Sequence, residues 1–247
     1  NSVLDYWKNW SKKYKNIYIN DITLHKLYSS KVLQKKFVED LGIPVPKTYY
    51  QGKLANYKGV LPKNYVLKRI EGCCSESVFV MVDGVNLMDN KNWSFEDIQN
   101  NIKNNKALIE EFVIDDNFTE LLPVIPYDYK VFMFGDKIAC IMVVKRDSPK
   151  NYSLYFYNEN WDKMKRLKSN GIKSSLYIPP PRHLKDLIMY SKKIGKKLNI
   201  PLRVDFYCGV DKVYFGELTA DPAHGKGYTK YGKNVLNRYF KEWKNNI

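Results

Sequence analysis

The sequence predicts an α+β fold, in which helices are mixed with mainly antiparallel hairpins. Pairs of apolar, β-branched segments are joined by short polar turns, which is the pattern of β-hairpins. Other stretches repeat their apolar residues at helical spacing. With 247 residues, the chain can form one large domain or two small ones around a sizeable core.

Four segments are expected to be helices. In "SSKVLQKKFVEDLG" (29–42), Ser30 can cap the start of a helix and Gly42 can end it. In "SFEDIQNNIKN" (94–104), an acidic residue stands three positions after a serine, which is a helix-start signal. The stretches 182–199 and 232–243 are amphipathic, so each is expected to cover one face of a sheet.

The expected strands alternate with these helices. "IPVPKTYY" (43–50) is expected to be an extended edge segment, because its prolines exclude a helix. "NYVLKRI" (64–70) and "VFVMV" (78–82) form a hairpin around the polar loop "EGCCSES". The remaining strands are expected in residues 107–113, in residues 127–147 with a turn at Gly135-Asp136, and in a closing hairpin over residues 201–218.

The chain is strongly basic, with 41 Lys and Arg against 26 Asp and Glu and a formal net charge of +15. Such a surface attracts nucleotides, nucleic acid, anionic lipid or acidic glycans. Evenly spread lysines on solvated faces would explain the same composition, so charge alone does not choose a partner.

Several common site types are excluded by the sequence. Cys73, Cys74, Cys140 and Cys208 form no CxxC pair, which is typical of reduced thiols in a cytosolic protein. The three histidines lack metal-ligand spacing with these cysteines, so a zinc site is not expected. No apolar run approaches the roughly 20 residues that cross a bilayer, and a signal peptide is not expected.

Two carboxylates are expected to meet in the closing hairpin. A turn near residues 209–211 would bring Asp205 opposite Glu217, with Arg203 and Thr219 on the same faces. Facing carboxylates repel unless a cation lies between them, and Mg²⁺ is often held by one or two carboxylates plus phosphates. The alternative is that both are solvated strand residues.

Lys68 and the acidic pair Glu110–Glu111 interrupt apolar strands. Lys68 stands at the root of the polar loop 71–77, where it and the loop amides can contact a phosphate. One of the two glutamates can accept a hydrogen bond from an adenine amino group or a ribose hydroxyl. The alternative for Lys68 is a position on a solvent-exposed strand face. The alternative for the glutamates is that one points outward and the other lies at the end of the strand.

Taken in order, these segments resemble the ATP-grasp superfamily, and most closely its TupA-like branch, which is associated with amide formation on acidic polysaccharides. The resemblance runs from about Lys31 to the closing helix, and its strongest match is "RVDFYCGVDKVYFGELTADPAHG" (203–225). The other matching segments are "SSKVLQKKFVEDLGIPVPKTYY", "YVLKRIEGCCSES", "ALIEEFV" and "YDYKVFMFGDKI".

The resemblance implies an ATP-grasp fold: two α+β subdomains with mainly antiparallel sheets clasp ATP, after a short N-terminal helical extension. It divides the chain into residues 1–60 (helical segment and entry strand), 61–113 (small lid subdomain) and 114–247 (large subdomain with the metal site). It also implies ATP and Mg²⁺ as cofactors, and we expect a cytoplasmic protein.

The resemblance also implies roles for individual residues. The residues expected to bind ATP are Lys31 and Lys68 at the phosphates, Gly72 and Ser75 in the lid, Glu110, Glu111, Phe112 and Val113 around adenine (the last two through their backbone), and Asp128 at the ribose. Those expected to bind Mg²⁺ are Asp205, Glu217 and Thr219, and the candidate catalytic residues are Arg203, Lys130 and Arg146.

The chain departs from the family pattern in two loops. The lid loop has a single glycine, Gly72, followed by Cys73 and Cys74. Asp221 and His224 stand where the TupA-like branch usually has Thr and Gly, and either is a candidate base for an incoming amine.

Three functions follow from these observations. The favoured one is an ATP-dependent carboxylate–amine ligase, which forms an amide through an acylphosphate on a uronic acid in a polysaccharide or sugar nucleotide, for capsule or cell-surface glycan synthesis. Its amine would be an amino acid or amino alcohol, and nucleic acid is not an expected partner. The alternatives are a peptide-forming ATP-grasp ligase and a non-catalytic binder of anionic glycan or nucleic acid.

Overall fold

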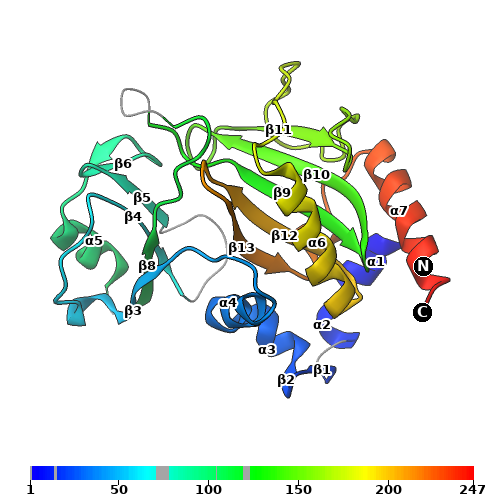
Figure 1. Cartoon of the computed structure of the whole chain (residues 1–247), viewed down its shortest axis with the longest axis horizontal. Helices are drawn as coiled ribbons and strands as arrows, with labels where there is room; N and C mark the ends of the chain where they lie inside the picture. The colour runs from blue at the N-terminus through cyan, green and yellow to red at the C-terminus, as the bar shows by residue number, and fades with distance from the viewer. Residues whose placement is uncertain (1, 14–15, 71–77, 104, 119–122) are drawn as a thin grey trace.

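The structure is a computed structural model, which describes residues 2–13, 16–70, 78–103, 105–118 and 123–247. Two antiparallel sheets dominate it (Figure 1). Residues of both sheets line one cleft. Helices cover both sheets, so the expected α+β class is confirmed.

The smaller half of the molecule is built on a six-stranded sheet. Its strands, in spatial order, are β3 (Thr48–Lys53), β8 (Lys106–Glu111), β4 (Asn64–Arg69), β5 (Val78–Val82), β6 (Val85–Asn86) and β7 (Lys91–Asn92). Helix α5 (Phe95–Ile102) packs on one face, against Tyr65, Leu67, Phe79 and Met81. The alternate residues of β4 and β5, including Lys68 and Val80, therefore point to the other face, toward the cleft.

The larger half is built on a five-stranded sheet. Its spatial order is β11 (Tyr152–Tyr157), β10 (Lys137–Arg146), β9 (Asp128–Phe134), β12 (Pro201–Cys208) and β13 (Val213–Thr219). The predicted hairpins β4–β5, β9–β10 and β12–β13 are all present. The pairing of β9 with β12 joins the last two hairpins into one surface.

The remaining helices belong to the larger half. They are α1 (Val3–Lys8), α2 (Trp10–Lys13), α3 (Leu24–Ser29), α4 (Lys31–Asp40), α6 (Leu184–Leu198) and α7 (Lys230–Lys244), with the short hairpin β1 (Tyr18–Ile19) and β2 (Ile22–Thr23) before α3. The expected caps are present, since Ser30 accepts a hydrogen bond at the start of α4 and Ser94 forms a capping box with Asp97 in α5.

Strand β9 changes character along one face. Asp128 and Lys130 open into the cleft, whereas Phe132 and Phe134 on the same face are covered by Trp7 of α1. Phe134 also contacts Tyr239 of α7. One strand face therefore supplies both a polar site and the apolar core that holds it in place.

Helix α6 covers the opposite face of this sheet, at a very close approach. A Cβ on Gly195 of α6 would lie 2.1 Å from the backbone oxygen of Gly135, which leaves room only for glycine. The β9–β10 turn at Gly135, which has φ +58°, is thereby packed against the helix. This close packing fixes the far end of β9, the strand that begins with Asp128 and carries Lys130.

The sequence predictions for individual elements are largely confirmed, with exceptions. The expected edge strand starts at Thr48, after the prolines, and it pairs with β8 at the edge of the smaller sheet. Strand β11 and the short strands β1, β2, β6 and β7 were not predicted. No helix in the described ranges combines the length and apolar character needed to span a bilayer.

Candidate active site

A cleft of about 740 Å³ lies between the two sheets and gathers most of the predicted site residues. The predicted residues that line it are Lys31, Lys68, Glu110, Glu111, Val113, Asp128, Lys130, Arg146, Arg203, Asp205, Glu217 and Thr219. Phe112 is buried in an apolar cluster with Val80 and Met88 instead, and its predicted contact is through its backbone. Gly72 and Ser75, the predicted lid contacts, lie outside the described residues.

Alternate side chains of the closing hairpin line the cleft. Asp205 pairs with Glu217 across β12 and β13, as the hairpin pattern predicts, and Arg203 pairs with Thr219. A bulge follows at Gly216, where a Cβ would lie 3.1 Å from both the Asp205 backbone oxygen and the Tyr207 ring. The two carboxylates therefore come from neighbouring strands onto one face.

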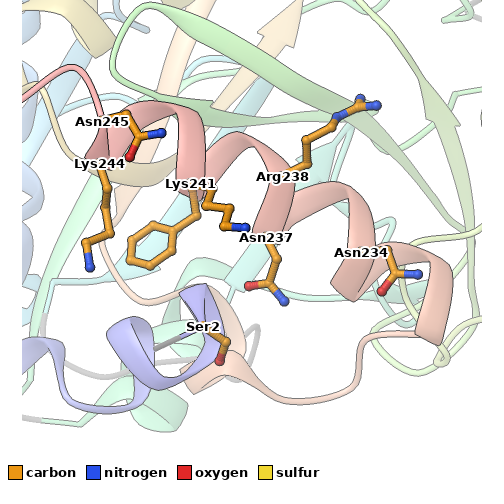
Figure 2. A pocket seen from close by; sticks show the side chains of 8 residues that line it. Ser2, Asn234, Asn237, Arg238, Lys241, Lys244 and Asn245 are labelled. Atoms are coloured by element: carbon orange, nitrogen blue, oxygen red, sulfur yellow. The ribbon is translucent and has the colours of Figure 1, made fainter.

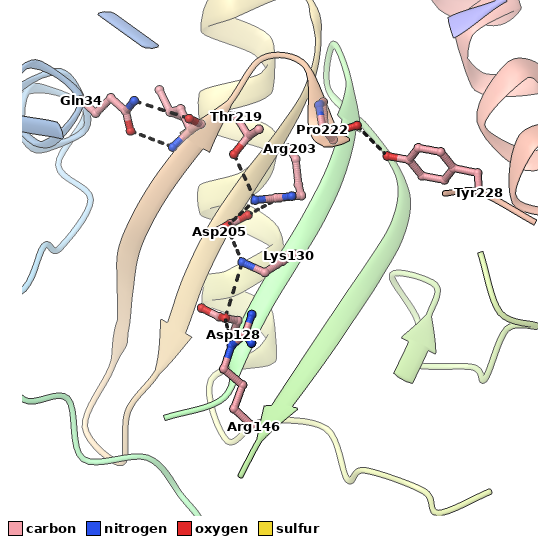
Figure 3. A network of polar contacts seen from close by, with 10 residues as sticks. Gln34, Asp128, Lys130, Arg146, Arg203, Asp205, Thr219, Pro222 and Tyr228 are labelled. Carbon is pink, nitrogen blue, oxygen red and sulfur yellow. Dashed lines mark hydrogen bonds and ion pairs between the residues drawn. The ribbon is translucent and has the colours of Figure 1, made fainter. Parts of the chain in front are cut away.

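Asp205 is at the centre of a cationic network (Figure 3). Arg203 donates from Nε to Oδ1 (2.6 Å) and from Nη2 to Oδ2 (2.8 Å), and Lys130 Nζ donates to Oδ2 (2.6 Å). Burial alone would raise the pKa of Asp205, but Arg203 and Lys130 outweigh burial and hold this pKa below its usual value. The sequence expectation of two mutually repelling carboxylates is therefore corrected: Asp205 is neutralised by protein cations, whereas Glu217 is exposed to the cleft.

Lys130 extends the network toward Asp128. Its Nζ lies 3.5 Å from Asp128 Oδ2, and Arg146 Nε lies 3.9 Å from the same oxygen (Figure 3). The predicted ribose contact thus stands next to two of the candidate catalytic cations.

Facing this network across the cleft is a second buried ion cluster. Glu110, which is 3% exposed, accepts from Lys35 Nζ at 2.6 Å and pairs with Lys68 Nζ at 2.5 Å. Burial would raise the pKa of Glu110, but the two lysines outweigh it and lower this pKa; conversely, burial would lower the pKa of Lys68, and Glu110 raises it. Lys68 is thereby held charged at the cleft wall.

The Glu110 carboxylate is occupied by these lysines. Lys35 also donates to the backbone oxygen of Pro46 and to Thr48 Oγ1, both at 2.9 Å, so Lys35 ties α4 to β3 and β8. A contact of the Glu110 side chain with adenine would compete with two ion pairs. That role stays a prediction.

Lys31 is the first residue of α4, and it reaches the same wall. Its Nζ lies 3.3 Å from the backbone oxygen of Arg69, to which it donates. Burial lowers the pKa of Lys31, and neighbouring Lys68 adds to this effect against the opposing influence of Glu217. A phosphate placed between Lys31 and Lys68 would bring negative charge beside both ammonium groups and offset their mutual repulsion.

The chain matches the family model described as TupA-like ATPgrasp over residues 8–240. It belongs to the TupA-like ATP-grasp family. This membership confirms the resemblance of the sequence, and the family is one of ATP-dependent ligases.

Solved structures support the fold of this TupA-like chain. The D-alanine–D-alanine ligase of Helicobacter pylori is similar with a TM-score of 0.50 and 17% identity, covering 97% of this chain and 66% of the ligase. The D-alanine–D-alanine ligase of Bacillus anthracis gives 0.50 and 14%, covering 90% of this chain and 70% of the ligase. The chain thus spans slightly less than two thirds of the Helicobacter ligase. No curated protein matches the chain.

The cleft face that carries Asp205 and Glu217 offers oxygen donors of the kind that Mg²⁺ prefers, but Asp205 would have to exchange a contact with Arg203 or Lys130 to bind a cation. Asp205 and Glu217 are two carboxylates on one cleft face, and Thr219 adds a hydroxyl beside Arg203. The described residues contain no group of three or more His, Cys, Asp and Glu side chains arranged to hold a metal. Such a pair suits a cation that completes its shell with substrate phosphates, as Mg²⁺ does.

Sequence reasoning missed two residues of the site. Tyr207 lines the cleft two positions after Asp205, so strand alternation was a usable signal. Lys35 stands four positions after Lys31 on α4 and thus on the same helix face, although its partner Glu110 is remote in sequence. An apolar wall of Val66, Val78, Val80, Met88 and Ile125 also lines the cleft and suits a planar base.

A second cavity, of about 850 Å³, runs along α7 beside Ser2. Arg238, Lys241 and Lys244 line it together with three asparagines (Figure 2). Its described lining contains no carboxylate, so it lacks the acid–base set of the first cleft and is not a second candidate active site.

Proposed function

We propose that the chain is a carboxylate–amine ligase that uses ATP to form an amide on a uronic acid. One observation carries the proposal: Lys68 of the smaller sheet and Lys31 of α4 line the same cleft as the Asp205–Glu217 pair of the larger sheet. Family membership supplies the reaction class. The uronic acid is proposed from the family's association with acidic polysaccharides and from the net charge of +15, which suits an anionic substrate.

In the proposed complex, the nucleotide lies between a small subdomain of residues 61–113 and a large one of residues 114–247. Adenine would rest on the apolar wall near Val113 and the ribose would face Asp128. The phosphates would meet Lys31 and Lys68. The lid residues Gly72 and Ser75 belong to the same proposal.

The first step transfers the γ-phosphoryl group of ATP to the acid. A carboxylate oxygen of the uronic acid attacks the γ-phosphorus, the bond to the β–γ bridging oxygen breaks, and ADP leaves. Phosphoryl transfer depends mainly on positioning and charge neutralisation, which Lys31, Lys68 and Arg203 would provide. Mg²⁺ held by Asp205 and Glu217 would add positive charge against the phosphates.

The second step is attack of the amine on the acylphosphate carbonyl, which releases phosphate and leaves the amide. Acylphosphates hydrolyse in water, so the cleft has to exclude it during this step. We propose a cytoplasmic setting, where ATP is supplied, and a role in capsule or cell-surface glycan synthesis.

An ADP-release screen tests this function. D-Glucuronate, D-galacturonate and their UDP-sugars would be combined with glycine, L-serine, L-alanine and ethanolamine. We expect ADP only when both an acid and an amine are present. ADP release with alanyl peptides in place of uronic acids would favour the peptide-forming alternative.

A non-catalytic binder of anionic glycan is the second candidate, and the cationic cavity on α7 favours it. Its binding to polygalacturonate would fall steeply with salt, and it would release no ADP under any combination. Substituting Lys241→Glu should then abolish polymer binding. If the chain is a ligase instead, Lys241→Glu should leave its turnover of sugar nucleotides unchanged.

A further inference from the structure

The loop that follows β13 is held in a strained conformation at the edge of the cleft. Ala223 and His224, two successive non-glycine residues, have φ of 52° and 47° in the left-handed region. Such backbone costs free energy and persists only where the surroundings enforce it. Strain of this kind is common at functional sites.

The surroundings do enforce it. Tyr228 Oη donates to the backbone oxygen of Pro222 (3.1 Å), and Lys168 Nζ donates to that of Lys226 (2.7 Å). On the other side, a Cβ on Gly225 would lie 2.5 Å from the backbone oxygen of Leu4 in α1. The loop is thus held by the Tyr228 and Lys168 side chains and packs closely against the N-terminal helix.

The contacts that hold this loop also position an aspartate–histidine pair. His224 Nδ1 lies 2.6 Å from Asp221 Oδ2, and both residues line the cleft. The Asp221 carboxylate favours the tautomer with the proton on Nδ1, which leaves the lone pair of Nε2 free to accept a proton. The His224 side chain is 76% exposed, so an incoming substrate can reach it.

Several other ionisable groups of the cleft are poorly suited to this task. Asp205 and Glu110 are each engaged by two cations, and Lys31, Lys68 and Lys130 are themselves cationic groups. Among the described cleft residues, His224 is the only histidine. It stands five positions beyond Thr219, whose hydroxyl accepts from Arg203 at 3.1 Å.

We infer that His224 is the general base that deprotonates the incoming amine, with Asp221 as the residue that positions its ring. The inference rests on the proposed function. An alkylammonium has no lone pair, so it must lose a proton before it can attack. Asp221 also adds a negative charge that attracts the ammonium group.

Nε2 of His224 takes one proton from R′NH₃⁺, and the nitrogen lone pair of R′NH₂ forms the C–N bond with the acyl carbon. The C–O bond to phosphate breaks, and phosphate leaves with its electron pair. The second proton of the nitrogen goes to phosphate, giving HPO₄²⁻, and His224 returns the first to water.

The test compares two nucleophiles, with the whole chain, ATP and Mg²⁺, and with D-glucuronate, D-galacturonate and their UDP-sugars as acids in turn. Hydroxylamine is largely unprotonated at neutral pH and needs no base, whereas ethanolamine arrives as a cation. In His224→Gln, the ratio of ethanolamide to hydroxamate should fall about a hundredfold, a typical contribution of general-base catalysis. Asp221→Asn should lower the same ratio less.

The matched control is His25→Gln, which changes an exposed histidine on α3 and should leave the ratio unchanged. Equal loss of both products in His224→Gln, or loss of neither, would overturn the inference while the ligase function stands. Absence of hydroxamate from the wild type with every acid would instead refute the ligase function, and the base with it.

Discussion

Arg203 and Asp205, two positions apart on β12, hold each other through two hydrogen bonds of 2.6 and 2.8 Å. The planar guanidinium fork matches the carboxylate, and Nη2 of the same arginine also donates to Thr219 on β13. This pair fixes the position of Asp205 while Glu217 remains exposed in the cleft. Of the two candidate metal ligands, Asp205 is therefore held in place by protein cations, and Glu217 is the open carboxylate.

Because Arg203 contacts Asp205 through two nitrogens, we expect Arg203→Lys to lower the turnover rate although the charge is conserved. A lysine ammonium is a point charge and cannot form the same two-point contact. We expect kcat to fall at least about tenfold, which is ~1.4 kcal/mol of transition-state stabilisation. Steady-state ADP release measures it, and near-wild-type kcat would show that the fork has no role in catalysis.

The buried Glu110 should matter for stability. Glu110→Gln removes the charge that compensates Lys35 and Lys68, and breaking a buried ion pair on one side typically costs about 3–5 kcal/mol. Because the folded-state pKa of Glu110 lies below its usual value, its contribution is present at neutral pH and is lost as pH falls through that folded-state pKa. Urea unfolding at pH 7 and in acid measures both effects.

The control is Asp83→Asn, which breaks the exposed pair of Asp83 with Lys63 at 3.5 Å. Exposed pairs contribute about 0–1 kcal/mol, so this variant should be nearly silent. If Glu110→Gln cost no more than Asp83→Asn, the buried cluster would not be a stabilising element.

Lys168 should make stability rise with pH in an alkaline window. Burial, with a smaller effect of nearby Arg203, lowers the pKa of Lys168 from 10.5 to about 8 in the folded protein. Between these values the unfolded chain binds more protons, so the free energy of unfolding increases with pH. We expect the difference between wild type and Lys168→Met to shift in favour of the wild type from pH 8 to about 10.5, as measured by urea unfolding. A difference that is constant with pH would contradict the lowered pKa.

Local patterns were sufficient for part of this site. The alternation of Arg203, Asp205 and, on the next strand, Glu217 and Thr219 predicted their pairing, because a hairpin fixes its own register. Lys68 was identified because it interrupts an apolar strand. Each of these signals is contained in a single short stretch of the sequence.

Other parts of the site depend on contacts between remote segments. Lys130 reaches Asp205 only because β9 lies beside β12, and no local pattern specifies that order of strands. Lys35 meets Glu110 across 75 positions in the sequence. The bracing of the 222–225 loop by α1 likewise depends on tertiary packing.

Glu217→Gln tests the central claim, that the cleft between the sheets is the catalytic centre of an ATP-dependent ligase. The variant keeps the size of the side chain and removes one negative charge from an exposed position, so the melting temperature without ligands should stay within a few degrees of wild type. ADP release with ATP, Mg²⁺, acid and amine should fall at least about a hundredfold, or ~2.7 kcal/mol. Turnover close to that of the wild type would contradict the claim.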